Sequence, residues 1–239
     1  MKIIIAMAGD GRRFLDKGIK IPKYKIEVND RSLFEWSILS LSNFFSDEFI
    51  FISREEIWDG EFVHEICSKY NITKFEHVLI QQTTNGQATT AIKASHLIDP
   101  SDEVAIYNID TYVKPGNIQI NRESGVSGII PVFRAEGDKW SFVEADKNGY
   151  VKQVTEKIRI SDMATIGFYY FSSWRIFTTF YERYNQSIIE KYNEVYIAPM
   201  YQYLIDEGLT VKTYVIESNR VIVLGTPEDI DRYKNIHIF

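Results

Sequence analysis

Residues 2–14 read KIIIAMAGDGRRF, an apolar run that ends at two glycines and a pair of arginines. A short, continuous apolar run of this kind is typical of a strand buried on both faces of a parallel sheet. Open α/β sheets bind their ligands beyond the carboxyl ends of such strands. The stretch therefore predicts a central strand followed by a ligand-binding loop.

Strand and helix patterns alternate along the rest of the chain. Further apolar runs predict strands at 48–53, 103–108, 128–133, 165–171 and 220–224. Amphipathic or capped segments predict helices at 33–41, 62–70, 89–97, 174–184, 195–205 and 227–234. This order predicts an α/β fold, a Rossmann-like three-layer sandwich whose mixed, mostly parallel sheet has helices on both faces.

The alternation is interrupted at residues 140–157, where two extended stretches flank Asp146-Lys147-Asn148-Gly149. Asn-Gly between such stretches is typical of a type I′ hairpin turn, which needs positive φ at both central residues. We expect a small antiparallel hairpin insertion over about 134–160. Since no linker or internal repeat is found, residues 1–239 are expected to form a single domain.

Composition excludes several classes of protein. The net charge of -6 argues against nucleic acid or an anionic membrane as the main partner. Cys67 is the only cysteine, so a disulfide framework and a cysteine-rich zinc site are excluded. The N-terminal apolar run is too short for a signal peptide or a membrane span, and we expect an unprocessed cytoplasmic protein.

Positive charge is concentrated in the loop after the first strand. Residues 9–25 carry six basic and two acidic side chains. Gly9 and Gly11 would let backbone N–H groups approach a phosphate, and Arg13 and Lys23 would add positive charge. Phe14 stands where a dinucleotide fingerprint needs its third glycine, and no Walker Gly-Lys-Ser/Thr follows. A phosphate site and a plain turn with solvated charges both remain open on these residues alone.

Six short motifs resemble, in order, those of the sugar-phosphate nucleotidyltransferases. The segment 8–14 with Pro22-Lys23 resembles the signature loop of that family, G-x-G-[ST]-R-[LFM] followed by P-K. Gln82 with 86–88 is similar to the family's base-reading Q-x(n)-G-T-A, and residues 108–110 are similar to its metal-binding N-x-D. Residues 154–157 are similar to its acceptor-facing E-K, residues 166–169 to its N-x-G-x-Y strand, and residues 225–229 to its closing G-T-P-E-D.

The resemblance implies an enzyme that couples a nucleoside triphosphate, preferably a pyrimidine, to a phosphorylated small molecule and releases pyrophosphate. The acceptor implied is a sugar 1-phosphate, used for surface polysaccharide biosynthesis. Because Asp110 follows an apolar run, it could hold Mg²⁺ between phosphate oxygens at a strand end, as the family's aspartate does. The implied catalytic residues are Arg13, Lys23 and Asp110; the nucleotide-binding residues are Ala8, Gly9, Gly11, Arg12, Gln82, Gly86, Gln87 and Asn108; the acceptor-binding residues are Glu156, Lys157 and Gly167.

Two positions depart from the family pattern. Arg12 stands where Ser or Thr is usual, and Val223 stands where many members have a second metal-binding aspartate. Valine cannot bind Mg²⁺, so the site either works with one carboxylate, or recruits Glu217 or Asp229, or has lost efficient catalysis. Three other functions remain open: a cytidylyltransferase for a non-sugar phosphate, a non-catalytic nucleotide-binding protein, and a glycosyltransferase. The last is disfavoured because residues 110–112 lack an Asp-x-Asp pair.

The remaining notable side chains favour ordinary structural roles. Cys67 is expected in the core, and at most one ring of 168–171 is expected to reach the site. Trp140 could stack on the acceptor. His64, His77, His96 and His237 lack metal-ligand spacing and are expected at the surface or its boundary. A tyrosine-rich helical region could form the interface of a homo-oligomer or pack within the chain; its members are Tyr181, Tyr184, Tyr192, Tyr196 and Tyr201.

Overall fold

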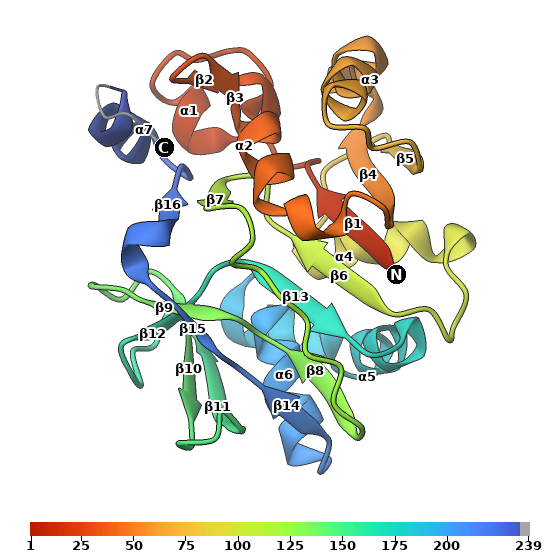
Figure 1. Ribbon diagram of the computed structural model, residues 1–239, viewed down its shortest axis with the longest axis vertical. Helices are drawn as coiled ribbons and strands as arrows, with labels where there is room; N and C mark the ends of the chain where they lie inside the picture. Colours follow the sequence, from red (N-terminus) through yellow and green to blue (C-terminus); the bar gives the residue numbers. More distant parts are fainter. Residues whose placement is uncertain (235–239) are drawn as a thin grey trace.

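The computed structural model describes residues 1–234 and contains a seven-stranded main sheet (Figure 1). Its strand order is β14-β8-β13-β6-β1-β4-β5, and β13 runs antiparallel to both neighbours while the other neighbouring pairs are parallel. A mixed, mostly parallel sheet is thus confirmed. The strands are β1 Lys2–Ala6, β4 Glu48–Arg54, β5 Phe75–Ile80, β6 Val104–Tyr107, β8 Val126–Ile129, β13 Phe168–Phe171 and β14 Thr210–Lys212.

Helices cover both faces of this sheet because its central strands are apolar on both sides. Along β1, Ile3 and Ile5 belong to one core with residues of α2 and α3, whereas Ile4 belongs to a second core with residues of α4, α5 and α6. The predicted three-layer arrangement is therefore confirmed. These helices are α2 Leu33–Ser40, α3 Gly60–Lys69, α4 Gln87–Ala91, α5 Trp174–Tyr192 and α6 Ala198–Asp206.

Two of the predicted strands, 128–133 and 165–171, are each broken between two sheets. The first divides into β8 and β9 (Val132–Arg134), and the second into β12 (Met163–Thr165) and β13. The second break lies at Gly167, which has φ 78°; a Cβ there would come 2.2 Å from Asn108 Nδ2. The prediction of one continuous strand over 165–171 was wrong because this left-handed residue turns the chain from one sheet to the other, and the run 128–133 is interrupted between β8 and β9 at residues 130–131.

The second sheet has the order β11-β10-β12-β9-β15 and is larger than a hairpin. It contains the predicted hairpin as β10 (Ser141–Ala145) and β11 (Val151–Glu156), and it adds β15 (Val215–Ile216) from near the end of the chain. The type I′ prediction was wrong, since only Gly149 of the turn has positive φ, at 80°. Asp146 Oδ1 instead accepts the N–H groups of Asn148 and Tyr150 at 2.8 and 3.0 Å, and this side-chain capping forms the turn.

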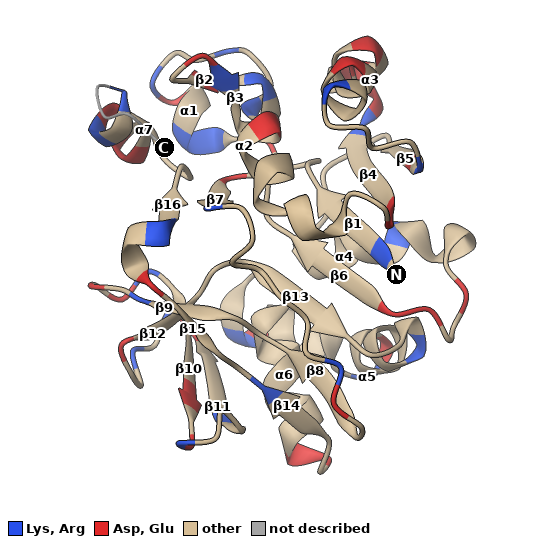
Figure 2. Ribbon diagram, viewed as in Figure 1, with Lys and Arg blue, Asp and Glu red and all other residues tan. Residues whose placement is uncertain are grey.

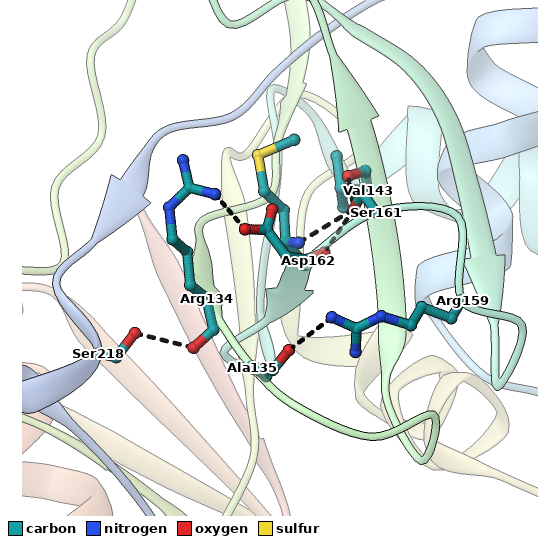
Figure 3. A network of polar contacts seen from close by, with 8 residues as sticks. Arg134, Ala135, Val143, Arg159, Ser161, Asp162 and Ser218 are labelled. Carbon is teal, nitrogen blue, oxygen red and sulfur yellow. Dashed lines mark hydrogen bonds and ion pairs between the residues drawn. The ribbon is translucent and has the colours of Figure 1, made fainter.

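Polar contacts hold the connecting segments of the second sheet together (Figure 3). Arg134 forms an ion pair with Asp162, and the Arg134 carbonyl accepts the Ser218 hydroxyl at 2.8 Å. Arg159 donates to the Ala135 carbonyl at 3.1 Å. These contacts join three chain segments that lie far apart in sequence.

The remaining elements are short. The predicted strand at 220–224 forms β16 (Val221–Val223), which pairs with β7 (Thr111–Val113) outside the main sheet. The predicted helix at 89–97 is α4 followed by a 3₁₀ segment, Ile92–Leu97. The others are α1 Arg12–Leu15, α7 Pro227–Tyr233, β2 Glu27–Val28, β3 Arg31–Ser32, and 3₁₀ turns Lys23–Lys25, Ser42–Phe44, Glu55–Ile57 and Ser218–Arg220.

Cys67 is fully buried, which confirms its predicted core position. His77 stacks on Trp58 at 5.1 Å between ring centroids, and His64 Nδ1 lies 3.5 Å from Ser68 Oγ. His237 lies outside the described residues. Within residues 1–234, no helix combines the length and the hydrophobicity needed to cross a bilayer.

Candidate active site

A cleft of about 460 Å³ lies beyond the carboxyl ends of β1 and β6 and is walled on one side by the second sheet. Such a position is the usual ligand site of an open α/β sheet. All of the predicted site residues except Arg12 and Gln82 line it: Ala8, Gly9, Gly11, Arg13, Lys23, Gly86, Gln87, Asn108, Asp110, Glu156, Lys157 and Gly167. Elements from the whole length of the chain thus meet at one place.

The glycine-rich loop after β1 is shaped by Gly11 and by the buried Phe14. Gly11 has φ 64° and is the N-cap residue of the short helix α1, and its carbonyl accepts the Phe14 N–H at 2.8 Å. Arg13 is exposed at the cleft. Arg12 lies outside the cleft, pairs with Asp10 at 3.5 Å and is 84% exposed. The extra arginine of this loop therefore adds no charge to the cleft wall. Figure 2 shows basic residues around α1 and the turns that follow it.

Lys23 and Asp110 form an ion pair inside the cleft. The Lys23 ammonium lies 2.5 Å from Asp110 Oδ2, and the two side chains are 21% and 24% exposed. Asp110 follows β6 and lies beside the β16 end, since a Cβ on Gly225 would come 3.2 Å from the same oxygen. A cation and a carboxylate are thus already assembled at the strand end.

The residues around Asp110 offer few protein ligands for a magnesium ion. Val223, opposite Thr111 in the β7–β16 pair, offers no oxygen ligand. Glu217 is 74% exposed and does not line the cleft, while Asp229 lines it but bonds Thr226 Oγ1 at 2.8 Å and lies 3.6 Å from Lys139 Nζ. Among residues 1–234 no cluster of three or more His, Cys, Asp or Glu could hold a metal. One carboxylate, Asp110, fits a Mg²⁺ ion that takes its other ligands from phosphate and water.

The loop at residues 84–88 is fixed by close backbone contact with the segment 194–196. Ala88 N–H donates to the Val195 carbonyl at 3.0 Å, and Val195 N–H donates to the Asn85 carbonyl at 2.8 Å. Gly86 lies between these bonds with φ 150°, and a Cβ there would come 2.5 Å from Val195 N. Gln87 Nε2 donates to Asn108 Oδ1 at 2.7 Å. Gln82 lies outside the cleft and is exposed, whereas the neighbouring Thr83 and Thr84 line it.

The wall formed by the second sheet carries charged and aromatic side chains. Glu156 is 4% exposed and accepts the Ser141 hydroxyl; burial raises the pKa of this carboxyl above its ordinary value of 4.5. Lys157, at φ 54°, donates to the Tyr196 hydroxyl at 2.6 Å. Trp140 lines the cleft and packs edge-on against Phe133, with centroids 5.6 Å apart.

Tyr196 is a site residue that sequence reasoning missed. The sequence pattern places it in a tyrosine-rich helical region, but it lies after the end of α5 and before α6, and it lines the cleft. Pro199 in the first turn of α6 is the signal that could have excluded Tyr196 from that helix.

Tyr201 is fully buried, with its hydroxyl donating to the Tyr170 carbonyl at 2.8 Å. Of the rings at 168–171, Tyr169 lines the cleft, as expected for at most one.

Comparisons with known proteins agree with this geometry. No family model and no curated protein matches the chain. Among solved structures, the nucleoside-diphosphate-sugar pyrophosphorylase from Vibrio cholerae RC9 superposes with a TM-score of 0.88 at 30% identity, over 97% of this chain and 99% of that one.

Two other structures are similar in fold at lower identity. The inositol-1-phosphate CTP transferase from T. maritima has a TM-score of 0.74 at 14% identity, over 98% of this chain and 96% of that one. A UDP-glucose pyrophosphorylase in complex with UDP-glucose has a TM-score of 0.75 at 17% identity, over 98% and 97%. The near-complete match at 30% identity shows that this chain belongs to the sugar-phosphate nucleotidyltransferase family and is an enzyme of the nucleotidyltransferase class.

Proposed function

We propose that this enzyme acts in the cytoplasm, where it joins a pyrimidine nucleoside triphosphate to a sugar 1-phosphate and releases pyrophosphate. The activated sugar that it makes would be used for surface polysaccharides. The observation that carries the proposal is the convergence of Lys23, Asp110 and Lys157 on one cleft. The names of the similar structures, which mention CTP and UDP-glucose, support a pyrimidine nucleotide.

The reaction needs alignment and charge neutralisation more than proton transfer. An oxygen of the acceptor phosphate attacks the α-phosphorus of the triphosphate. The bond between that phosphorus and the oxygen bridging the α- and β-phosphates breaks, and pyrophosphate leaves with the electron pair. The attacking phosphate is already ionised at neutral pH, so the chain need not supply a general base or a nucleophile. Binding both phosphates in fixed positions and stabilising the developing charge lower the barrier.

Lys23 and Arg13 would stabilise the triphosphate. Lys23 is directed by Asp110 and would contact the α-phosphate, where charge develops as the new bond forms. Arg13, exposed at the same cleft, would contact the β- and γ-phosphates that become pyrophosphate. Gly9 and Gly11 leave the loop backbone open to phosphate oxygens because they carry no side chain.

Asp110 would also hold a Mg²⁺ ion bound to the triphosphate, and that ion would neutralise phosphate charge. A single protein carboxylate suffices because Mg²⁺ usually keeps waters and phosphate oxygens as ligands. Val223 therefore does not exclude catalysis. Lys23 would have to share or release the Asp110 carboxylate when the ion binds.

The 84–88 loop and the second-sheet wall would hold the two substrates apart and in order. Gly86, Gln87 and Asn108 would contact the nucleoside, with Gln87 fixed by its bond to the Asn108 amide. On the opposite side, Lys157 would contact the acceptor phosphate, and Glu156 and Gly167 would line the acceptor pocket.

The proposal is tested by a pyrophosphate-release screen with Mg²⁺. Purified protein is incubated with CTP, UTP, dTTP, GTP or ATP and with glucose 1-phosphate, mannose 1-phosphate, myo-inositol 1-phosphate or phosphocholine. We expect release with a pyrimidine triphosphate and a sugar 1-phosphate, and its abolition by a chelator. Release only with phosphocholine would instead support a non-sugar acceptor, and nucleotide binding without release would support a non-catalytic protein.

A further inference from the structure

Tyr196 connects the two halves of the cleft. Its hydroxyl accepts a hydrogen bond from the Lys157 ammonium at 2.6 Å, and the ammonium lies 4.6 Å from the centre of the Tyr196 ring. Its neighbour Val195 is bonded through both backbone groups to the 84–88 loop. One short segment therefore touches the lysine of one wall and the backbone of the other.

The backbone at Lys157 is constrained so that its side chain meets this tyrosine. Lys157 has φ 54°, a left-handed conformation that residues with a side chain adopt only when the surrounding structure holds it. Its N–H donates to the Trp140 carbonyl at 2.9 Å and closes the β10–β11 pair. The second sheet thus fixes the backbone position of Lys157, and Tyr196 fixes the position of its ammonium group.

The Tyr196 hydroxyl is suited to hold an ammonium group. Burial and a hydrogen bond with Glu194 raise the pKa of Tyr196 above its ordinary value of 10, so the phenol stays protonated at neutral pH. Its O–H is then available to Glu194, and its lone pairs accept from Lys157. An ammonium has three donors, so Lys157 can keep this bond and still donate to a phosphate.

We propose that Tyr196 is a positioning residue that holds the Lys157 ammonium at a fixed place relative to the 84–88 loop, so that the acceptor phosphate is aligned with the bound nucleotide. This inference rests on the proposed function, in which Lys157 contacts the acceptor phosphate and the loop contacts the nucleoside. Tyr196 would act through Lys157 and would not itself touch the reacting atoms.

The test is Tyr196→Phe, assayed with the triphosphate and phosphomonoester that release pyrophosphate fastest in the screen above. Because a hydrogen bond to a charged group is lost, kcat/KM for the phosphomonoester is expected to fall about tenfold, while KM for the triphosphate stays within about twofold. Tyr181→Phe is the matched control. It removes another half-buried tyrosine hydroxyl, one that bonds Thr89 at 3.2 Å, and it is expected to leave both constants unchanged.

A double-mutant cycle separates positioning from a general structural role. In a Lys157→Met background, Tyr196→Phe is expected to change kcat/KM by less than about twofold, because the group it positions is gone. If Tyr196→Phe is unfolded at the assay temperature, Glu194→Gln replaces it; it keeps the phenol, weakens its anchoring, and is expected to reduce kcat/KM for the phosphomonoester alone, by about threefold.

The inference is overturned if the active wild-type enzyme and Tyr196→Phe have the same kcat/KM for the phosphomonoester. It is also overturned if the loss persists in full without Lys157, or if both substrates are affected equally. These results leave the proposed function intact. Absence of pyrophosphate release by the wild-type protein overturns the proposed function, and this inference with it.

Discussion

Replacing Gly86 with alanine is expected to weaken both the fold and the nucleotide side of the cleft. At φ 150° the backbone strain of an alanine lowers the free energy of unfolding by about 1–3 kcal/mol. The new Cβ would also come 2.5 Å from Val195 N and 2.6 Å from Val195 O, and backbone atoms cannot rotate away. Losing one of the two backbone bonds between these segments adds about 1 kcal/mol. We expect a total of about 3 kcal/mol, which is roughly 6–12 °C in melting temperature for a protein of this size.

The matched control is Gly116→Ala, which also places alanine at positive φ, 85°, but with no atom within 4 Å of the new Cβ. It is expected to cost about 1 kcal/mol, from backbone strain alone. Thermal unfolding followed by circular dichroism measures both variants, and KM for the triphosphate is expected to rise only in Gly86→Ala. Melting temperatures of the two variants within about 2 °C of each other would refute the argument from the Gly86–Val195 contact.

Three further predictions concern other residues. Lys157→Met is expected to raise KM for the phosphomonoester about 10- to 100-fold because a charged donor is lost; steady-state kinetics showing an equal rise for the triphosphate would contradict this. Cys67 is expected to resist thiol reagents at pH 8 in the native protein and to react in urea, since burial raises the pKa of its thiol to about 12; fast native labelling would contradict it. Burial raises the pKa of Glu156, so the folded state binds more protons than the unfolded state from about pH 4.5 up to the raised pKa. The free energy of unfolding is therefore expected to fall as pH rises through that window. Urea titrations at several pH values are expected to show this fall for the wild-type protein and not for Glu156→Gln.

The central strands and the layer arrangement were predictable because their residues are buried on both faces. β1 and β4 each contain a continuous apolar run, at residues 3–6 and 49–52, which is the pattern typical of a central parallel strand. The edge strands β5 and β14 were missed because each is only partly buried, so polar residues interrupt their apolar pattern. An edge strand is defined by its pairing partner, which a local pattern does not reveal.

The break at Gly167 was hidden for a different reason. The residues on both sides of it are apolar and buried, so the run reads as one strand although its two halves belong to different sheets. A lone glycine within such a run was the signal, since it marks a bulge, a bend or a close backbone approach.

The cleft was predictable from short motifs, but its tertiary pairings were not. The glycine-rich loop and Asp110 directly follow predicted parallel strands, so both are expected at the end of the sheet where the carboxyl ends of the strands meet. The Lys23–Asp110 pair and the Lys157–Tyr196 contact join residues 87 and 39 positions apart, and nothing local in the sequence connects them. Arg12 shows the same limit, because two adjacent arginines read alike although only Arg13 lines the cleft.

Lys23 and Asp110 are the pair on which nucleotidyl transfer in this cleft is proposed to depend, so the Asp110 carboxylate is the group to remove. Pyrophosphate release with Mg²⁺ is measured for the wild-type protein and for Asp110→Asn, using the substrate pair from the screen, with thermal unfolding as the check on folding. We predict release by the wild-type protein and a loss of about 10²- to 10³-fold in kcat for Asp110→Asn, because the variant lacks the carboxylate that directs Lys23 and would hold the metal. Equal kcat values for the two folded proteins would contradict the claim.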